Sequence, residues 1–282
     1  AIYDRFGIVP TYVVDHPVAA DTAAVRFLRG LKEEGKAEIG AHLHPWVTPP
    51  HEEPVNARNS WQCNLPPELE RAKIARLTEA VSKAFGEPPI AFKAGRHGFG
   101  PHTGRILADL GYRIDCSKVA YTDLRPGGGP DFRGVGPDPH WLEEGLFEVP
   151  VTVGFFGGAA ASGPRLGGLF DSPAARRLRL PGLAARAGLV SRSRLTPEGV
   201  SAEEQCRLIE AMVRRGHRTF TLVYHSPSLE PGHTPYVNSA GELTDFLAAI
   251  EAVLRYFRDR LGGRFTTLSP LLAHHEPQRD AA

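Results

Sequence analysis

The sequence predicts an α/β fold in which parallel strands alternate with outer helices, and among such folds it favours a barrel. Short apolar segments and amphipathic segments alternate along the chain, which is typical of a parallel sheet covered by helices. No Gly-x-Gly-x-x-Gly follows the first predicted strand, and this argues against a dinucleotide-binding sheet. Residues with useful chemistry gather where predicted strands end, which is where barrels bind their ligands.

Length and composition fit one globular domain. The chain has 282 residues, of which 41% are hydrophobic and 23% charged, as in ordinary globular proteins. A net charge of +1 gives no reason to expect nucleic acid as a partner. The three cysteines form no Cys-x-x-Cys pair, which favours a reducing compartment. With no membrane-length apolar run and no visible signal peptide, we expect a cytoplasmic or membrane-peripheral location. The oligomeric state is left open.

The first half of the chain alternates regularly between the two kinds of element. Strands are predicted at residues 8–14, 38–41, 90–94 and 112–115, where short apolar runs end at turn residues. Helices are predicted at residues 3–6, 22–34, 66–85 and 101–110. Pro66-Pro67 and Gly86 mark the start and the end of the longest helix.

The second half continues the pattern. Strands are predicted at residues 147–153, 219–224 and 265–267, and the tail from residue 274 is polar. Ser201-Ala202-Glu203-Glu204 and Ser239-Ala240-Gly241-Glu242 are capping boxes, in which serine and glutamate satisfy free backbone N–H groups at a helix start. A helix is therefore predicted after each.

Two histidines stand where the strand at residues 38–41 ends. Side chains alternate along a strand, so His42 and His44 would project to the same side if the strand continues. Two converging imidazoles at a strand end suit a divalent cation such as Zn²⁺. Alternatively, one histidine caps the strand and the other is solvated. The loop of about twenty residues that follows, with Trp46 and Trp61, is expected to face a substrate.

Several segments resemble those of the polysaccharide deacetylase (NodB-homology, carbohydrate esterase) family, whose members are metal-dependent hydrolases on a distorted parallel (β/α)7 barrel. The similar segments are residues 7–14, 38–42, 94–98, 110–117, 148–151 and 223–226. The stretch His42-Leu43-His44-Pro45-Trp46 resembles the WalW-like branch. The resemblance implies a single deacetylase-like barrel domain over residues 1–273 and a polar tail at residues 274–282.

Two features depart from the family pattern. The family's first acidic motif, which supplies a metal ligand and the catalytic base, has no counterpart here. We expect it either upstream of Ala1 or absent, with the barrel then lacking its first strand. The family's two ligating histidines are four residues apart, whereas position 46 is Trp46, so His44 takes the second ligand position.

The resemblance implies a zinc-dependent hydrolase of carbon–nitrogen non-peptide bonds that removes acetyl groups from N-acetylated sugars of a polysaccharide. His42, His44 and a carboxylate would hold the ion, and Asp15 is the candidate carboxylate, although Asp-His-Pro is also an ordinary turn. His225 would protonate the leaving amine, or it bonds only to backbone. Arg96 would orient the catalytic carboxylate through a bidentate pair, or it forms a structural salt bridge.

Further residues complete the expected site. Asp115 is expected to be structural, capping the turn at Cys116-Ser117. The residues expected to contact the substrate are Trp46, Trp61, His97 and Tyr236.

An insertion at about residues 154–200 differs in character from the barrel. It opens with a glycine- and alanine-rich run at residues 157–163, which reads as a flexible linker. One interpretation is a basic lid for an anionic glycan, a lipid-linked sugar phosphate or a membrane surface. The other is a solvated helical excursion whose leucines pack on the barrel. The basic residues are Arg176, Arg177, Arg179, Arg186, Arg192 and Arg194, and the leucines are Leu178, Leu180, Leu183 and Leu189.

Two hypotheses of different classes follow. The first is the metal-dependent carbohydrate deacetylase. The second is a catalytically impaired barrel that binds a glycan or a partner protein without hydrolysing it. An acidic pair upstream in the full gene would favour the first hypothesis.

Overall fold

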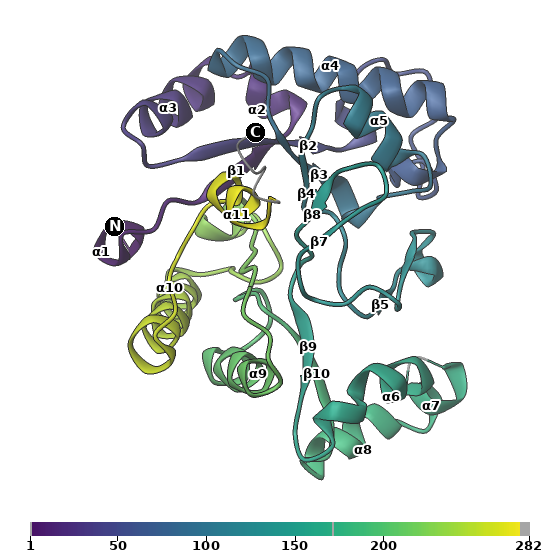
Figure 1. Ribbon diagram of the computed structural model, residues 1–282, viewed down its shortest axis with the longest axis vertical. Coiled ribbons are helices and arrows are strands. Elements are labelled where there is room, and N and C mark those ends of the chain that lie inside the picture. Colours follow the sequence, from purple (N-terminus) through teal and green to yellow (C-terminus); the bar gives the residue numbers. More distant parts are fainter. Residues whose placement is uncertain (1, 171, 277–282) are drawn as a thin grey trace, which may run out of the picture.

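The computed structural model describes residues 2–170 and 172–276, and it confirms the α/β prediction (Figure 1). A six-stranded sheet has the order β1-β2-β3-β4-β8-β7, with parallel pairing throughout except between β7 and β8. Its strands are β1 (Thr11–Val14), β2 (Glu38–Leu43), β3 (Ala91–Ala94), β4 (Ile114–Asp115), β8 (Phe147–Glu148) and β7 (His140–Trp141).

Most helices of the first half cover the outer face of this sheet (Figure 1), whereas residues 2–6 pack against the C-terminal half of the chain. Leu43 and Phe92 from the sheet pack with Ile74, Leu77 and Leu107 in one buried cluster. The longest helix begins at Pro67 and ends where Gly86 adopts φ 86° and returns its N–H to Ser82, as a left-handed cap requires. These helices are α1 (Ile2–Phe6), α2 (His16–Ala20), α3 (Thr22–Glu33), α4 (Pro67–Phe85) and α5 (Thr103–Asp109).

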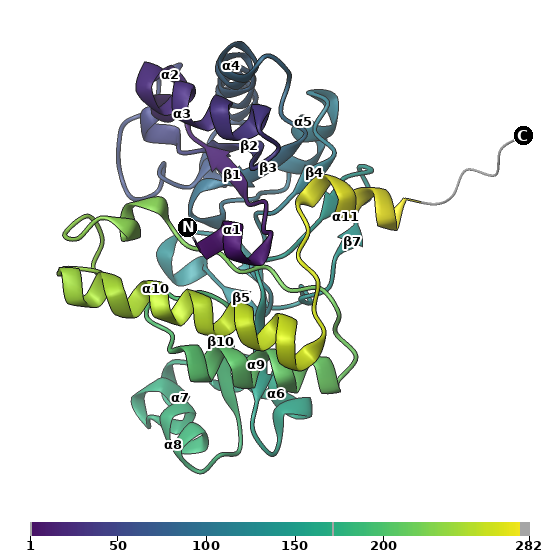
Figure 2. The ribbon, with the colours of Figure 1, turned by 90° about the vertical axis from the view of Figure 1, so that its left-hand side faces the viewer.

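The second half adds two short antiparallel pairs, β5–β6 and β9–β10, and further helices. Helices α9 and α10 lie side by side (Figure 2). The elements are β5 (Thr122–Asp123), β6 (Asp131–Phe132), β9 (Val153–Phe156), β10 (Ser191–Arg194), α6 (Gly163–Phe170), α7 (Pro173–Arg177), α8 (Leu180–Arg186), α9 (Ala202–Arg214), α10 (Ala240–Arg255) and α11 (Leu268–His275). Short 3₁₀ turns are η1 (Pro45–Val47), η2 (Gln62–Asn64), η3 (Gly95–His97), η4 (Arg125–Gly127), η5 (Ala160–Ser162) and η6 (Ser226–Leu229), and η7 (Tyr256–Arg260) is a π-helix.

Both predicted capping boxes start helices. The Ser201 hydroxyl accepts a hydrogen bond from Glu204 N at the start of α9, and the Ser239 hydroxyl accepts one from Glu242 N at the start of α10. Each serine thus satisfies a backbone donor that the helix itself cannot. Within the described residues, no helix is both long and apolar enough to cross a bilayer.

Several predicted strands differ from the structure. Residues 219–224 and 265–267 form no ladder, although their apolar runs have the composition of strands. In the first segment, Thr221 N donates to the Thr152 hydroxyl and Val223 N to the Leu195 carbonyl, so these amides are satisfied without a partner strand. The strand predicted at 147–153 is two strands, β8 and β9, and the tail predicted from residue 274 begins inside α11.

Candidate functional site

The two histidines of β2 converge as predicted. His42 lies in β2, and His44 follows it with extended φ −113° and ψ 118°. Their ring centroids are 4.4 Å apart. The Nδ1 atom of His42 lies 3.0 Å from the Lys93 carbonyl oxygen. Because a carbonyl only accepts, Nδ1–H donates to it and the lone pair remains on Nε2.

Both imidazoles are held in the neutral form. Burial lowers the pKa of His42 to about 3, and the nearby His44, Lys93 and His225 side chains favour the same direction. Burial also lowers the pKa of His44, and Asp15 partly opposes this shift. A neutral imidazole is the form that binds a cation, so the pair is ready to bind one at neutral pH.

Glycine is required immediately beside His44. A Cβ atom on Gly95 would overlap both the Nδ1 atom of His44 and the Leu43 carbonyl oxygen. In the described part of the chain, His44 Nδ1 is buried and has no hydrogen-bond partner. Such an orphaned nitrogen in a tight cradle is costly unless a ligand at the site compensates.

Gly95→Ala is therefore expected to displace His44 and to lower the free energy of unfolding by roughly 1–3 kcal/mol, as overpacking does. Chemical denaturation measures the loss, and divalent-ion binding is expected to weaken with it. Gly30→Ala is the matched control, since nothing lies within 4 Å of a Cβ there. In the middle of α3, that change should be neutral or stabilising. Equal stability of the two variants would contradict the role given to Gly95.

The turn that follows β3 is held in a strained conformation. Arg96 has φ 55° and His97 has φ 62°, a left-handed backbone that costs of order 1–3 kcal/mol per residue. His97 Nδ1–H donates to the Ser117 carbonyl at 2.9 Å. The Ser117 hydroxyl accepts from Ala94 N at 2.7 Å and donates to Asp115 Oδ1 at 2.6 Å. Ser117 N also donates to Asp115, which confirms Asp115 as the cap of this turn.

A second buried carboxyl lies opposite Asp115. Glu148 is its register partner across β4 and β8, and both side chains are fully buried. Burial raises the pKa of Asp115, and burial together with the neighbouring Asp115 raises the pKa of Glu148 well above its usual value. Two carboxyls in such a position cannot both ionise at low cost, so burial and mutual repulsion favour a shared proton on the pair.

Arg96 does not make the carboxylate pair predicted for it among the described residues. Its guanidinium instead lies 4.6 Å from the centroid of the Trp61 ring, a cation–π distance. Trp61 is only 4% exposed and packs against Gly127, Gly128 and Gly129. Its ring therefore supports Arg96 from inside, and the prediction of a substrate-facing Trp61 is corrected.

His225 is paired with a carboxylate that the sequence did not reveal. Its Nδ1 lies 2.8 Å from Glu198 Oε2, and its backbone N donates to Oε1 of the same residue. The Ser228 hydroxyl donates a hydrogen bond of 2.6 Å to Oε1 of Glu198. The hydrogen bond that His225 donates to the Glu198 carboxylate raises the pKa of His225. Burial alone would raise the pKa of Glu198, but the bonds from His225 and Ser228 outweigh it and lower that pKa.

Asp15 is the N-cap of α2, where its Oδ1 accepts from Val18 N at 3.0 Å. Asp15 thus starts a helix instead of the ordinary turn considered from the sequence, and its charge acts on His44. Over residues 2–170 and 172–276, no group of three histidine, cysteine, aspartate or glutamate side chains converges closely enough to hold a metal. His42 and His44 lie together, and their role as metal ligands stays a prediction.

A buried lysine holds the first part of the loop at residues 45–66 through hydrogen bonds. Lys73 on α4 is 0% exposed. Its ammonium donates to the carbonyls of Pro45, Thr48 and Pro50 at 3.0, 2.7 and 2.6 Å. It also pairs with Glu53 at 2.9 Å. One charge therefore fixes the path of the chain directly after His44.

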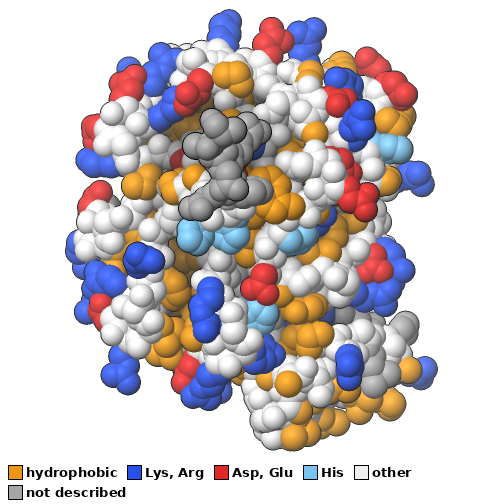
Figure 3. Space-filling model, in the orientation of Figure 1, with side chains coloured by type: hydrophobic (Ala, Val, Ile, Leu, Met, Phe, Trp, Pro, Cys, Tyr) orange, Lys and Arg blue, Asp and Glu red, His pale blue; other side chains and the backbone are white. Residues whose placement is uncertain are grey.

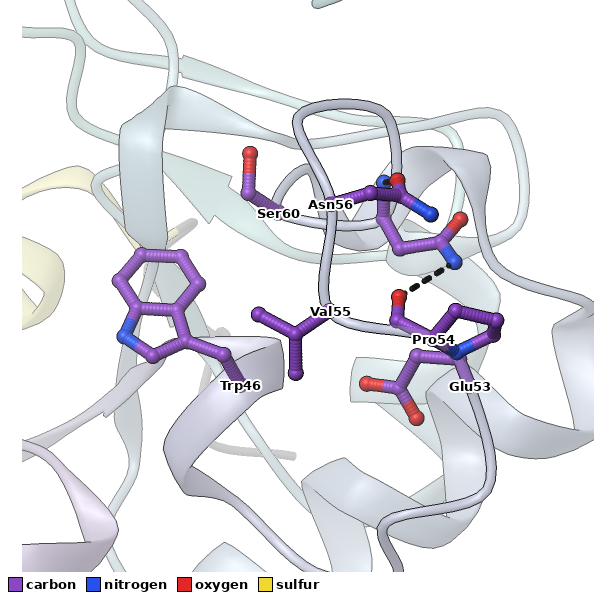
Figure 4. A pocket seen from close by; sticks show the side chains of 7 residues that line it. Trp46, Glu53, Pro54, Val55, Asn56 and Ser60 are labelled. Carbon is purple, nitrogen blue, oxygen red and sulfur yellow. Dashed lines mark hydrogen bonds between the residues drawn. The ribbon is translucent and has the colours of Figure 1, made fainter.

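A small pocket opens beside Trp46 in this loop (Figure 4). Trp46 and Val55 face each other across it, and the Asn59 amide donates to the Pro54 carbonyl along its wall. The Trp46 ring lies 4.5 Å from the His44 ring, so the pocket adjoins the imidazole pair. The lining residues are Trp46, Glu53, Pro54, Val55, Asn56, Asn59 and Ser60. Tyr236 is exposed and lies next to Gly199, in the loop that carries Glu198.

No family model matches this chain, and no curated protein sequence matches it. Among solved structures, the Puue allantoinase is similar over 97% of this chain and 69% of that chain, at 14% identity and a TM-score of 0.51. The chain shares that fold. A family 4 acetyl xylan esterase from Clostridium thermocellum, solved with a cobalt ion, is similar over 97% of this chain and 81% of that chain, at 14% identity and a TM-score of 0.47.

A Mycobacterium smegmatis structure, described provisionally as a polysaccharide deacetylase, is similar over 54% of this chain, at 22% identity and a TM-score of 0.39. This chain spans 43% of that protein's length. The similarities are those of an α/β barrel with a mostly parallel sheet and outer helices.

Proposed function

We propose that this chain is a metal-dependent hydrolase that removes acetyl groups from N-acetylated sugars of a polysaccharide, and that it belongs to the WalW-like branch of the deacetylases. The observation that supports the proposal is that the His42–His44 pair and the Glu198–His225 pair lie near one another: the charge of His225 lowers the pKa of both imidazoles. This proximity supports a cation site and a proton donor that act on the same substrate.

The imidazole pair fits a divalent cation such as Zn²⁺. His42 presents a free Nε2 lone pair because its Nδ1–H is engaged by the Lys93 carbonyl, the arrangement usual for ligating histidines. His42 and His44 would hold the ion, and Asp15 is the proposed carboxylate ligand, because its charge acts on His44. When bound, the ion would polarise an acetamide carbonyl and lower the pKa of a water molecule.

The protein's own groups supply the proton transfer and the positioning. Glu198 raises the pKa of His225 and so favours its protonated form, which would donate a proton to the leaving amine. Glu198 holds the ring through Nδ1, which leaves Nε2–H free to donate. Arg96, supported on Trp61, offers guanidinium donors that bind an oxygen of the substrate or a carboxylate base.

The exposed Trp46 side chain is proposed as the surface that contacts a sugar ring. An aromatic side chain offers an apolar face to the C–H groups of a sugar, and amide groups offer hydrogen bonds to hydroxyls. Trp46 and Asn56 supply both kinds of contact next to His44. His97 and Tyr236 are proposed as further substrate contacts, with no nucleic acid as partner.

Glu198→Gln tests the acid. Losing the carboxylate charge lowers the pKa of His225, so the protonated form exists only at lower pH. We expect the alkaline limb of kcat/KM to move to lower pH, whereas His225→Ala is expected to reduce kcat roughly 10²–10⁴-fold. Rates of acetate release from an N-acetylated oligosaccharide, measured across pH, give both results. An alkaline limb that stays in place in Glu198→Gln would exclude His225 as the acid.

The rival function is a barrel that binds glycan without hydrolysing it. The observation that favours it is the use of Asp15 as a helix cap, which leaves the imidazole pair without a third ligand in the part of the chain described. Binding of an N-acetylated oligosaccharide by calorimetry, with no acetate released at any metal concentration, would support the rival.

A further inference from the structure

Residues 157–190, here called the arm, project from the lower end of the molecule beyond β9 and β10 (Figures 1 and 2). The arm contains α6, α7 and α8, and the structure describes it apart from residue 171. Two backbone hydrogen bonds join the first residues of the arm to its last residues. Gly158 N donates to Gly188 O, and Ala159 N donates to Leu189 O. Residues 157–163 are thus attached to the end of the arm, and their flexibility stays a prediction.

The base of the arm is firmly mounted. A Cβ atom on Gly163 would overlap the Phe155 ring, so glycine lets α6 approach β9 closely. Arg215 on α9 donates at 2.8 Å to the carbonyls of both Ala160 and Phe155. These contacts fix the arm to the barrel and define where its tip points.

The leucines at the tip are exposed, so the prediction that they pack on the barrel is wrong. The exposed fractions are 65% for Leu178, 38% for Leu180, 55% for Leu183 and 54% for Leu189. Figure 3 shows apolar side chains gathered at this end of the molecule. Exposing several large apolar side chains together is unfavourable in water and marks an interaction surface.

The positive charge of the arm indicates that its partner is anionic. The arm contains five arginines and a single acidic residue, Asp171, which lies outside the described residues, as does the Arg176 side chain. Arg177, Arg179 and Arg186 are exposed beside the leucines. Apolar side chains surrounded by arginine fit the surface of an anionic bilayer, where leucines enter the acyl boundary and guanidinium groups meet lipid phosphates.

We infer that the arm docks the protein on an anionic lipid surface, through the exposed leucines of α7 and α8 and the arginines beside them. In this docking, the arm lies at the surface of the bilayer and does not cross it. This docking does not depend on the proposed hydrolysis, and the arm contains none of the residues assigned to that reaction.

The test is co-sedimentation of the full chain with vesicles of phosphatidylcholine alone and of phosphatidylcholine mixed with phosphatidylserine. We expect binding to the mixed vesicles that weakens as salt is raised. Leu178→Ser with Leu183→Ser, and separately Arg179→Glu with Arg186→Glu, are each expected to weaken that binding about tenfold or more.

Matched controls come from the opposite end of the molecule. Phe27→Ser removes an exposed apolar side chain on α3, and Arg76→Glu with Arg105→Glu reverses two exposed charges. These controls should bind like the wild type. All of the altered side chains are exposed, so circular dichroism and Tm should remain unchanged, and acetate release from a soluble oligosaccharide should also be unaffected.

Three results would overturn the inference. One is equal sedimentation with neutral and mixed vesicles. Another is undiminished binding in both arm variants. The third is a wild type that ignores vesicles but forms a dimer that the leucine changes abolish, which would identify a second copy as the occupant.

Discussion

Replacing Lys73 with methionine is expected to lower the free energy of unfolding by roughly 3–5 kcal/mol, the usual effect of breaking a buried ion pair. The change leaves Glu53 buried without its partner and leaves three loop carbonyls without their donor. Equilibrium unfolding in denaturant measures the loss as a shift of the midpoint at constant slope.

The controls separate burial from charge. Arg76→Met breaks an exposed pair with Glu79 on the same helix and should change stability by less than about 1 kcal/mol. Adding Glu53→Gln to Lys73→Met should restore part of the loss, because no uncompensated charge then remains. If Lys73→Met were as stable as Arg76→Met, the loop would need another anchor.

His42→Ala and His44→Ala are expected to reduce kcat/KM roughly 10³-fold or more, since a lost cation removes several kcal/mol of transition-state stabilisation. The wild type should carry a divalent ion in near-equal amount, and both variants should lose most of it. Plasma mass spectrometry of the purified proteins measures the ion, and acetate release measures the rate.

His140→Ala is the matched control, because His140 lies on the edge strand β7 and its ring Nδ1 contacts the carbonyl of the nearby Asp138. It should keep both ion and rate. An ion that persists in both His42→Ala and His44→Ala would place the metal elsewhere. A wild type that binds no ion, yet releases acetate at a rate that both variants share, would remove these two residues from the reaction.

Local patterns predicted the part of the fold that local rules govern. The alternating apolar segments from β1 to β4 and the two capping boxes depend on neighbours in sequence, and they were found with small errors at the ends. Residues 219–224 have the composition of a strand, but strand formation depends on a partner. Their amides bond instead to Thr152 and Leu195.

The convergence of His42 and His44 at the end of β2 was predictable from the sequence, whereas His225 follows residues 219–224, which form no strand. Glu198 was not predictable, because no pattern around it indicates that a loop after β10 brings its carboxylate to His225. The arm was misjudged for a related reason. Leucines at helical spacing predict a helix face that is buried against the protein. The three-dimensional structure shows instead that the arm projects away from the barrel, so that these leucines stay exposed.

Among the described residues, β1 is an edge strand of the sheet and pairs with β2. The hydroxyls of Tyr3 in α1 and Tyr224 lie 2.7 Å apart and join the two halves of the chain. This contact between the halves is here called the seam. The imidazole pair belongs to one side of this seam, and His225 with Glu198 belongs to the other. The two histidine pairs that the proposed reaction needs therefore come from different halves of the chain, and contacts between side chains such as Tyr3 and Tyr224 help to hold them together.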